Sequence, residues 1–437
     1  MTTTIQRLRL HFVCGLTTGI QFDVPRTPGA FRRQQAETAS ALGEEIAGWE
    51  VRVPESYADL RTSSRSGLDV QPRVWDKDSV GTTRLPVGFL RFTKDAAVDA
   101  RAGAVADVEA QLELLVWADG TAVIVASVKP DLPGAISPEQ AQQWIDATTF
   151  GHLDEALRSH AQALLDAVER RLSGPEHGGP AVSGPIGDVE VRYVGRHRLV
   201  HIDAEPCAAS VDDIGRAMYS DALDQNLVDI SSDERRYAAP ANGISIEIAP
   251  GQQSMLLPVA RYYQRWIAAI TKADDELYDE IVRLSTASQA FGEDSHTQGH
   301  ARQLFYEHRD VLNAQTPVHT TAWNTYVSTW RVAELQADVE EKVAVVDELN
   351  RSLRENVANR IAARTGAVVT FLTALTLVSI VTGIAAFVLS EERLSTLTRW
   401  SLVGASLFLA LTLFAVSIQP LLVRRVGRGR TGAVADR

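Results

Sequence analysis

The chain has 437 residues, of which 45% are hydrophobic and 22% charged, and its formal net charge is -12. This length is enough for two or three domains of roughly 100–200 residues each. The acidic balance argues against a nucleic-acid partner, because neutralising phosphates requires a surplus of Lys and Arg. The only cysteines, Cys14 and Cys207, offer no disulfide framework and fit a reducing compartment.

Apolar residues that alternate with polar ones predict β-strands in the first 250 residues. Residues 8–12 have the period of two that is typical of a half-buried strand. Residues 111–117 and 121–128 flank Asp119-Gly120, and Asp-Gly between two β-rich runs is a strong hairpin signal. We expect further strands at residues 85–92, 189–202 and 244–248.

Helices interrupt these strands. Ser137-Pro138-Glu139-Gln140 combines an N-cap residue, a proline at the first helical position and a glutamine at the third, which predicts a helix over residues 137–172. The Gly- and Pro-rich residues 173–188 indicate a loop or a subdomain boundary. The pattern predicts an α+β or α/β cytoplasmic domain over residues 1–172, which continues over residues 189–250.

Residues 251–365 change to a helical character. A helix is expected over residues 258–291, and a longer one follows, because there is no glycine or proline between Pro317 and Gly366. Its apolar residues recur at steps of three or four and line one face: Val332, Leu335, Val339, Val343, Val346, Leu349, Leu353, Val357 and Ile361. We expect this stalk helix to run from about Val327 to Leu389 without a break. A single apolar stripe on a long helix requires a partner that covers it, and we expect this partner to be the same helix of other subunits.

Two stretches near the C-terminus are long and uncharged enough to cross a membrane. Residues 366–389 and 400–423 each exceed the roughly 20 apolar residues that a spanning helix needs. Residues 390–399 form a short outer loop between them. Arginines precede the first stretch and lie in the basic tail, residues 424–437, so the positive-inside rule places both termini in the cytoplasm. The chain is therefore expected to be a multi-pass protein of the inner or plasma membrane, with the lipid bilayer as a partner.

Polar residues recur along the first predicted span. They are Thr370, Thr373, Thr376, Ser379, Thr382 and Gly383. If they lined a pore, their oxygens would face the ions. The alternative is that the hydroxyls bond back to their own helix or pack one helix against another.

An acidic cluster lies within the helix expected over residues 258–291. It consists of Asp274, Asp275, Glu276, Asp279 and Glu280. Carboxylates from neighbouring subunits could bind Mg²⁺ or another divalent cation here, although a solvated acidic face is the alternative. We find no phosphate-binding loop, nucleophile elbow or paired CxxC motif, and therefore expect no enzymatic activity.

The end of the first span resembles the CorA family of divalent-cation channels. Gly383-Ile384 resembles the segment that leads into the family's Gly-Met-Asn signature, and Ala386-Phe387-Val388 stands in the place of that signature. Ser390-Glu391-Glu392 resembles the acidic outer loop, and Arg424-Arg425 the basic C-terminal end. The resemblance implies a pentamer whose outer mouth is formed by these residues: Ala386, Phe387, Val388, Glu391 and Glu392.

Two functions remain open from the sequence. The resemblance implies a divalent-cation channel or transporter that is gated by its cytoplasmic domain. However, Ala386-Phe387-Val388 offers no polar side chain to a hydrated Mg²⁺ ion, which prefers oxygen ligands. The alternative is a membrane-anchored sensor or effector that keeps the scaffold and has lost selective transport.

Overall fold

The structure is a computed structural model. It describes residues 5, 7–22, 28–58, 74–76, 88–98, 108–129, 136–137, 139–141, 143–144, 153–173, 190–203, 229–232, 235–238, 244–248, 254, 256–286, 298, 301–302, 304–306, 308–309, 311, 320, 323–324, 326–327, 332–390, 395–398, 400–408, 410 and 412. The chain divides into two compact units. The first contains residues 1–287 and 294–347, and the second contains residues 288–293 and 348–437.

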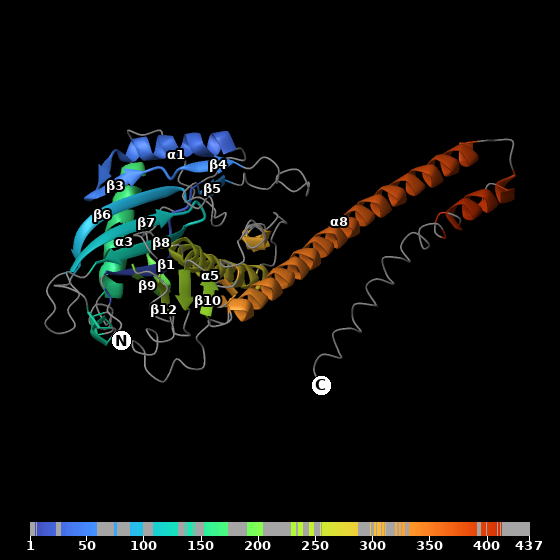
Figure 1. Cartoon of the computed structure of the whole chain (residues 1–437). Coiled ribbons are helices and arrows are strands. Elements are labelled where there is room, and N and C mark those ends of the chain that lie inside the picture. The colour runs from blue at the N-terminus through green and yellow to red at the C-terminus, as the bar shows by residue number, and fades with distance from the viewer. Residues whose placement is uncertain are drawn as a thin grey trace. The chain divides into compact units, whose positions relative to one another are not determined.

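Ten strands of the described residues form one mixed sheet in the first unit (Figure 1). Its order is β10-β11-β12-β9-β1-β8-β7-β6-β3-β2, and among the described strands every neighbouring pair is antiparallel except β12 with β9. The strands are β1 (Leu8–Thr17), β2 (Glu45–Ile46), β3 (Trp49–Arg52), β6 (Leu90–Val98), β7 (Val108–Val116), β8 (Thr121–Val128), β9 (Arg192–Ile202), β10 (Asp229–Ser232), β11 (Arg235–Ala238) and β12 (Ile244–Ile248). A separate two-stranded sheet pairs β4 (Ser56–Ala58) with β5 (Val74–Asp76).

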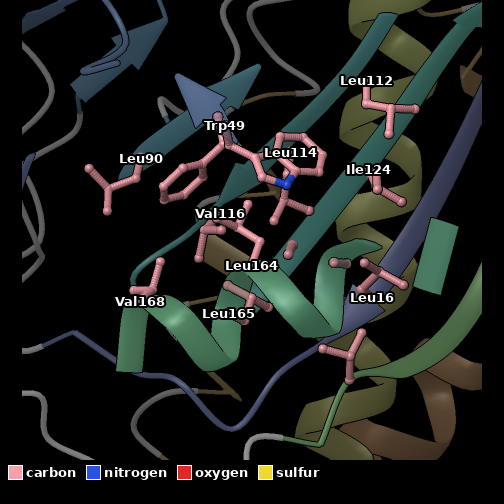
Figure 2. Packing of buried hydrophobic residues seen from close by; sticks show 14 of the residues in the cluster. Leu16, Trp49, Leu90, Leu112, Leu114, Val116, Ile124, Leu164, Leu165 and Val168 are labelled. Atoms are coloured by element: carbon pink, nitrogen blue, oxygen red, sulfur yellow. The ribbon is translucent and has the colours of Figure 1, made fainter. Parts of the chain in front are cut away.

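Helices pack on both faces of the large sheet. Helices α1 (Pro28–Leu42) and α3 (Leu153–Leu172) share one apolar core with residues of β1, β7 and β8 such as Phe12. Figure 2 shows Leu164 and Val168 of α3 near Val116 of β7 in this core. Helix α5 (Leu256–Thr286) packs on the other face, where Ala260 meets Val13, Val123 and Val125 among others. The first unit is thus an α+β sandwich of three layers.

The predicted hairpin is confirmed. β7 and β8 pair antiparallel, and Gly120 in their turn has a φ of 79°. The Asp119 carboxylate accepts hydrogen bonds from the Thr121 backbone N–H at 3.0 Å and from the Thr121 hydroxyl at 2.6 Å. These bonds fix the turn, because the side chain of Asp satisfies a backbone donor two residues later.

The capping box at Ser137 is also confirmed. The Ser137 backbone N–H donates to Gln140 Oε1 at 2.9 Å, and the Gln140 backbone N–H donates to Ser137 Oγ at 3.3 Å. The described residues between 139 and 144 are helical, and α3 covers the C-terminal part of the predicted helix. Residues 174–189 lie outside the described residues.

Several boundaries differ from the prediction, and two of them have a local cause. The strand expected at residues 85–92 is β6, Leu90–Val98, and residues 81–87 lie outside the described residues. The alternation of large apolar residues ends at Phe92, because the next residue of β6 that packs against the core is the small Ala96. Helix α5 begins at Leu256, before Pro258, because Ser254 Oγ accepts a hydrogen bond from the Leu257 backbone N–H at 3.1 Å and caps the helix.

The predicted stalk is helix α8, which runs unbroken from Val332 to Ser390. Within the described part of the chain it is the one helix long and apolar enough to cross a membrane. The side chains of its most apolar stretch are almost all exposed. The second predicted span is helical at its described positions between residues 400 and 412, and the rest of it lies outside the described residues. The structure therefore presents a sheet domain and a long C-terminal helix with one candidate span, where the sequence predicts two.

Candidate functional site

The first part of α8 is docked on the first unit through apolar side chains. Val332, Val339 and Val346 of α8 are buried there, at 0–3% exposure. These residues belong to the apolar stripe that the sequence predicts, so this end of the stripe is covered within the chain. The Lys342 ammonium lies 5.9 Å from the centre of the Tyr278 ring of α5.

Ion pairs add to this docking. Lys342 Nζ donates to Asp274 Oδ1 of α5 at 2.6 Å, and both side chains are about three-quarters buried. Asp347 accepts hydrogen bonds from the side chains of Gln298 and Arg302. A partly buried pair is screened less by solvent than a surface pair, so the Lys342–Asp274 contact contributes more to docking than the exposed Arg302–Asp347 pair.

The stripe continues beyond Asp347 without a cover among the described residues. Leu349, Leu353 and Val357 are only half-buried, and Ile361 is 60% exposed. Four apolar side chains on one face of a helix gain free energy when a partner removes them from water. This uncovered stripe of the second unit therefore favours packing against a partner.

The stripe can be followed into the apolar segment. At about 100° per residue, 18 residues complete about five turns, so Val343, Ile361 and Ser379 lie on one face of α8. Thr370 lies about 180° from Ser379 on the same count. The candidate pore-lining residues are therefore divided between faces. Ser379 is in line with Val343 and Ile361 of the stripe, and Thr382 is in line with Val346.

Most of the hydroxyls donate back to their own helix. The donors are Thr370 to Gly366, Thr373 to Val369, Thr376 to Leu372 and Thr382 to Val378, with each oxygen 2.8–2.9 Å from the carbonyl four residues earlier. A hydroxyl has one proton and two lone pairs, so only the lone pairs remain for another group. Such oxygens can face a cation but have no proton left to donate to an anion. A Cβ added at Gly383 would meet nothing within 4 Å.

The predicted outer mouth is only partly described. In the described residues Phe387 is 68% exposed and Val388 is 5% exposed, and Glu391 and Glu392 lie outside the described residues. A helix begins after Ser395, whose Oγ accepts a hydrogen bond from the Thr398 backbone N–H at 3.2 Å. Trp400 follows in this helix and is 63% exposed, which suits a side chain at a membrane interface.

The acidic cluster on α5 is divided among ion pairs within the chain. Asp274 pairs with Lys342, Glu276 lies 3.8 Å from Lys272, and Glu280 is held by Arg283 at 2.7 Å. Asp275 and Asp279 stand in the same helix. Among the described residues, no three Asp, Glu, His or Cys side chains form a group that could hold a metal.

A buried polar chain that the sequence did not indicate joins the sheet to the segment before α8. His197 Nε2 of β9 lies 2.9 Å from Ser245 Oγ of β12, and Ser245 Oγ lies 2.8 Å from the Tyr326 hydroxyl. The Tyr263 hydroxyl of α5 donates to the Tyr326 carbonyl at 3.0 Å. Burial lowers the pKa of His197 to about 3, and burial raises the pKa of Tyr326, so both groups stay neutral and can only share hydrogen bonds.

Aromatic rings surround this chain. The His308 ring is stacked on Trp266 at 3.7 Å between centroids, and Trp323 packs against Tyr262 and Tyr263. Burial, with a smaller effect of Arg265, lowers the pKa of His308 to about 3. The segment that leads into α8 is thus anchored on α5 by buried rings. Sequence spacing gave no signal for it, because its contacts join residues that are 46–81 positions apart.

The turn of the β7–β8 hairpin is also tied to α5. Arg265 Nη2 donates to Asp119 Oδ2 at 3.3 Å, and Lys272 Nζ donates to the Asp119 carbonyl. The Arg265 guanidinium lies 5.2 Å from the centre of the Trp117 ring. Helix α5 therefore contacts the sheet at one side and α8 at the other, through Lys342.

No known protein family matches the chain, and no curated protein sequence matches it.

Proposed function

We propose that the chain is a CorA-like oligomeric membrane protein, a divalent-cation channel or transporter whose cytoplasmic domain controls its transmembrane helices. The observation that supports this most is α8: one helix holds both the side chains docked on the first unit and an uncharged segment of spanning length. No proline interrupts it, and sharp kinks in helices usually arise at prolines. A displacement of the docked end is therefore passed along the helix.

Self-association is the second part of the proposal. Two exposed apolar surfaces of α8 favour contacts with other copies of the same helix: the uncovered stripe from Leu349 to Ile361 and the apolar stretch that follows it. By the CorA resemblance the assembly is a pentamer in the inner or plasma membrane, with two spans per chain and both termini in the cytoplasm.

The cation preference is supported by the hydroxyl chemistry of α8. The threonines of the apolar segment donate their hydroxyl protons to carbonyl oxygens of the same helix. The lone pairs of these hydroxyls remain free and suit Mg²⁺ or another divalent cation. In an assembly built on the stripe, Ser379 and Thr382 are the hydroxyls nearest the common axis, and Thr370 faces away from it.

A second function is favoured by the outer end of the helix. Ala386, Phe387 and Val388 contain no polar side chain, and Phe387 is exposed. A protein with this end would act as a membrane-anchored sensor or effector, in which the docking of α8 reports the state of the cytoplasmic domain and no selective transport takes place.

The decisive experiment is ion flux into liposomes. Full-length protein in liposomes is exposed to Mg²⁺, Co²⁺ or Ni²⁺ outside, and an internal fluorescent indicator records entry. We expect flux that Ser379→Leu abolishes and the matched variant Thr370→Leu preserves, because the two residues face opposite sides of α8. If no ion enters under any gradient, the transport function is wrong and the sensor function remains.

Control by the cytoplasmic domain is tested in the same liposomes. Lys342→Glu places two carboxylates together at the α5–α8 contact, and the double variant Asp274→Lys/Lys342→Glu restores an opposite pair. Couplings between contacting charges are about 0.5–3 kcal/mol, so we expect a several-fold change in flux that the double variant reverses. Equal flux in all three proteins would show that docking of α8 does not control transport.

A further inference from the structure

We infer that Arg360 and Arg364 of α8 form a binding site for the headgroups of anionic phospholipids on the cytoplasmic side. The inference rests on the proposed membrane span. Both arginines are exposed in the second unit, and they lie four residues apart, so their side chains emerge on neighbouring positions of one helix face. Two guanidinium groups so spaced can bind one phosphate group from both sides.

Their depth along the helix matches the headgroup region. Gly366 begins the uncharged segment, and at about 1.5 Å per residue Arg364 lies about 3 Å and Arg360 about 9 Å before it. The polar region of a bilayer adds about 5–8 Å on each side of the hydrocarbon core. The flexible arginine side chains, which extend several ångströms, therefore reach the level of the lipid phosphates. This depth favours a lipid over a soluble phosphate compound.

The local charge is uncompensated. In the described residues no carboxylate pairs with Arg360 or Arg364, and α8 contains no acidic residue after Glu355. Glu355 itself accepts a hydrogen bond from Arg351 Nε at 3.2 Å, one turn earlier in the helix. Arg351 is thus a natural control, since it carries the same charge on the same helix but has a carboxylate partner and lies farther from the apolar segment.

Arg360 and Arg364 lie on the face of the apolar stripe. At about 100° per residue, Arg364 is in line with Val346, and Arg360 is about 20° from Leu353. Copies of α8 packed on the stripe would therefore bring these arginines close together, where the phosphate of an anionic headgroup would offset their mutual repulsion. Each basic group near an anionic membrane surface contributes about 1 kcal/mol, which corresponds to about a fivefold preference for an anionic lipid.

The test is lipid selectivity in nanodiscs. The full-length protein is assembled in nanodiscs with equal amounts of phosphatidylglycerol and phosphatidylcholine, and native mass spectrometry counts each lipid that stays bound after release. We expect the wild-type protein and Arg351→Gln to retain phosphatidylglycerol preferentially. Arg360→Gln/Arg364→Gln should reduce this preference by about tenfold or more, and Gln preserves the helix because its helical propensity is high.

The outcomes separate the inference from the proposed function. If the double variant enters nanodiscs with unchanged thermal stability and keeps the lipid preference, or if Arg351→Gln lowers it equally, the headgroup site is wrong although the membrane span stands. Displacement of the lipid by inorganic phosphate would show a site for free anions, which also overturns the lipid assignment. Failure of every variant to enter nanodiscs would instead contradict the membrane span itself.

Discussion

Gly15 lies where the backbone of α5 passes close to the sheet. A Cβ built on Gly15 of β1 would lie 2.5 Å from the Gln264 carbonyl oxygen, and one on Gly195 of β9 would lie 2.9 Å from Gln264 Oε1. The two glycines are opposite each other in the β1–β9 pair, where the register shifts after Gly15. A glycine within a strand commonly marks such a close approach of another backbone.

We expect Gly15→Ala to lower the free energy of unfolding by about 1–3 kcal/mol, because the methyl group pushes against a backbone atom that cannot move by itself. The denaturant midpoint of the full-length protein in detergent, followed by tryptophan fluorescence, measures this. Gly29→Ala is the control: nothing lies within 4 Å of its Cβ and it stands in α1, so that change should leave the midpoint equal or raise it. Equal midpoints for Gly15→Ala and the wild type would show that α5 shifts freely.

His308 is a buried histidine that folding keeps neutral. Its ring is stacked on Trp266, and its Nδ1 lies 3.1 Å from the Tyr262 hydroxyl. Burial lowers its pKa from 6.5 to about 3. Between these two pH values the unfolded chain binds a proton that the folded chain does not. The free energy of unfolding therefore decreases as the pH falls below about 6.5.

The variant His308→Gln removes this titration and keeps a polar atom near Tyr262. We expect it to be less stable than the wild type at pH 7, but to lose about 2 kcal/mol less stability on going to pH 5. His160→Gln is the matched control, because His160 is only half-buried and its pKa is lowered less. Denaturant titrations at the two pH values measure the difference. Parallel losses for wild type and His308→Gln would contradict the neutral state of His308.

At the scale of elements, those with a local signal could be predicted from the sequence. Asp119-Gly120 specified the β7–β8 hairpin, Ser137 and Gln140 specified a helix start, and the stripe of α8 specified a long helix. Each of these signals depends on residues within a few positions of each other, where a turn or a cap satisfies the backbone directly.

One local signal is overridden by a stronger one: Pro258 predicts a later start for α5, whereas Ser254 caps the helix before it. Contacts that depend on distant residues have no such signal. The chain of His197, Ser245 and Tyr326 could not be predicted, because alternation in β9 tells only that His197 points inward. Its partner comes from β12, which lies beside β9 in the parallel pair that no local pattern indicates.

At the scale of the whole molecule, the boundary between the compact units falls inside α8, after Asp347. A boundary within one helix is unusual, because domains are normally separated by exposed loops where few contacts cross. Before it the helix buries valines against the first unit, and after it the described side chains are mainly exposed. This contrast agrees with the proposed membrane span, in which the first end of α8 packs against protein and the second end lies in lipid.

The number of spans and their direction follow from labelling of introduced cysteines in intact cells. With two spans, Thr396→Cys in the outer turn should react with an impermeant maleimide from outside. Ala358→Cys and Ala435→Cys should react only after permeabilisation, because the positive-inside rule keeps both arginine-rich flanks in the cytoplasm. Cys14, which is buried, and Cys207 set the background in the parent protein.

Each alternative gives its own pattern of labelling. A chain that crosses the membrane once would expose Ala435→Cys to the outside together with Thr396→Cys. Reaction of Ala358→Cys in intact cells would reverse the direction and place the sheet domain outside the cell, where a domain whose two cysteines offer no disulfide framework is not expected. Only protection at both flanks with reaction at the turn agrees with a cytoplasmic domain that acts on a hairpin of two spans through α8.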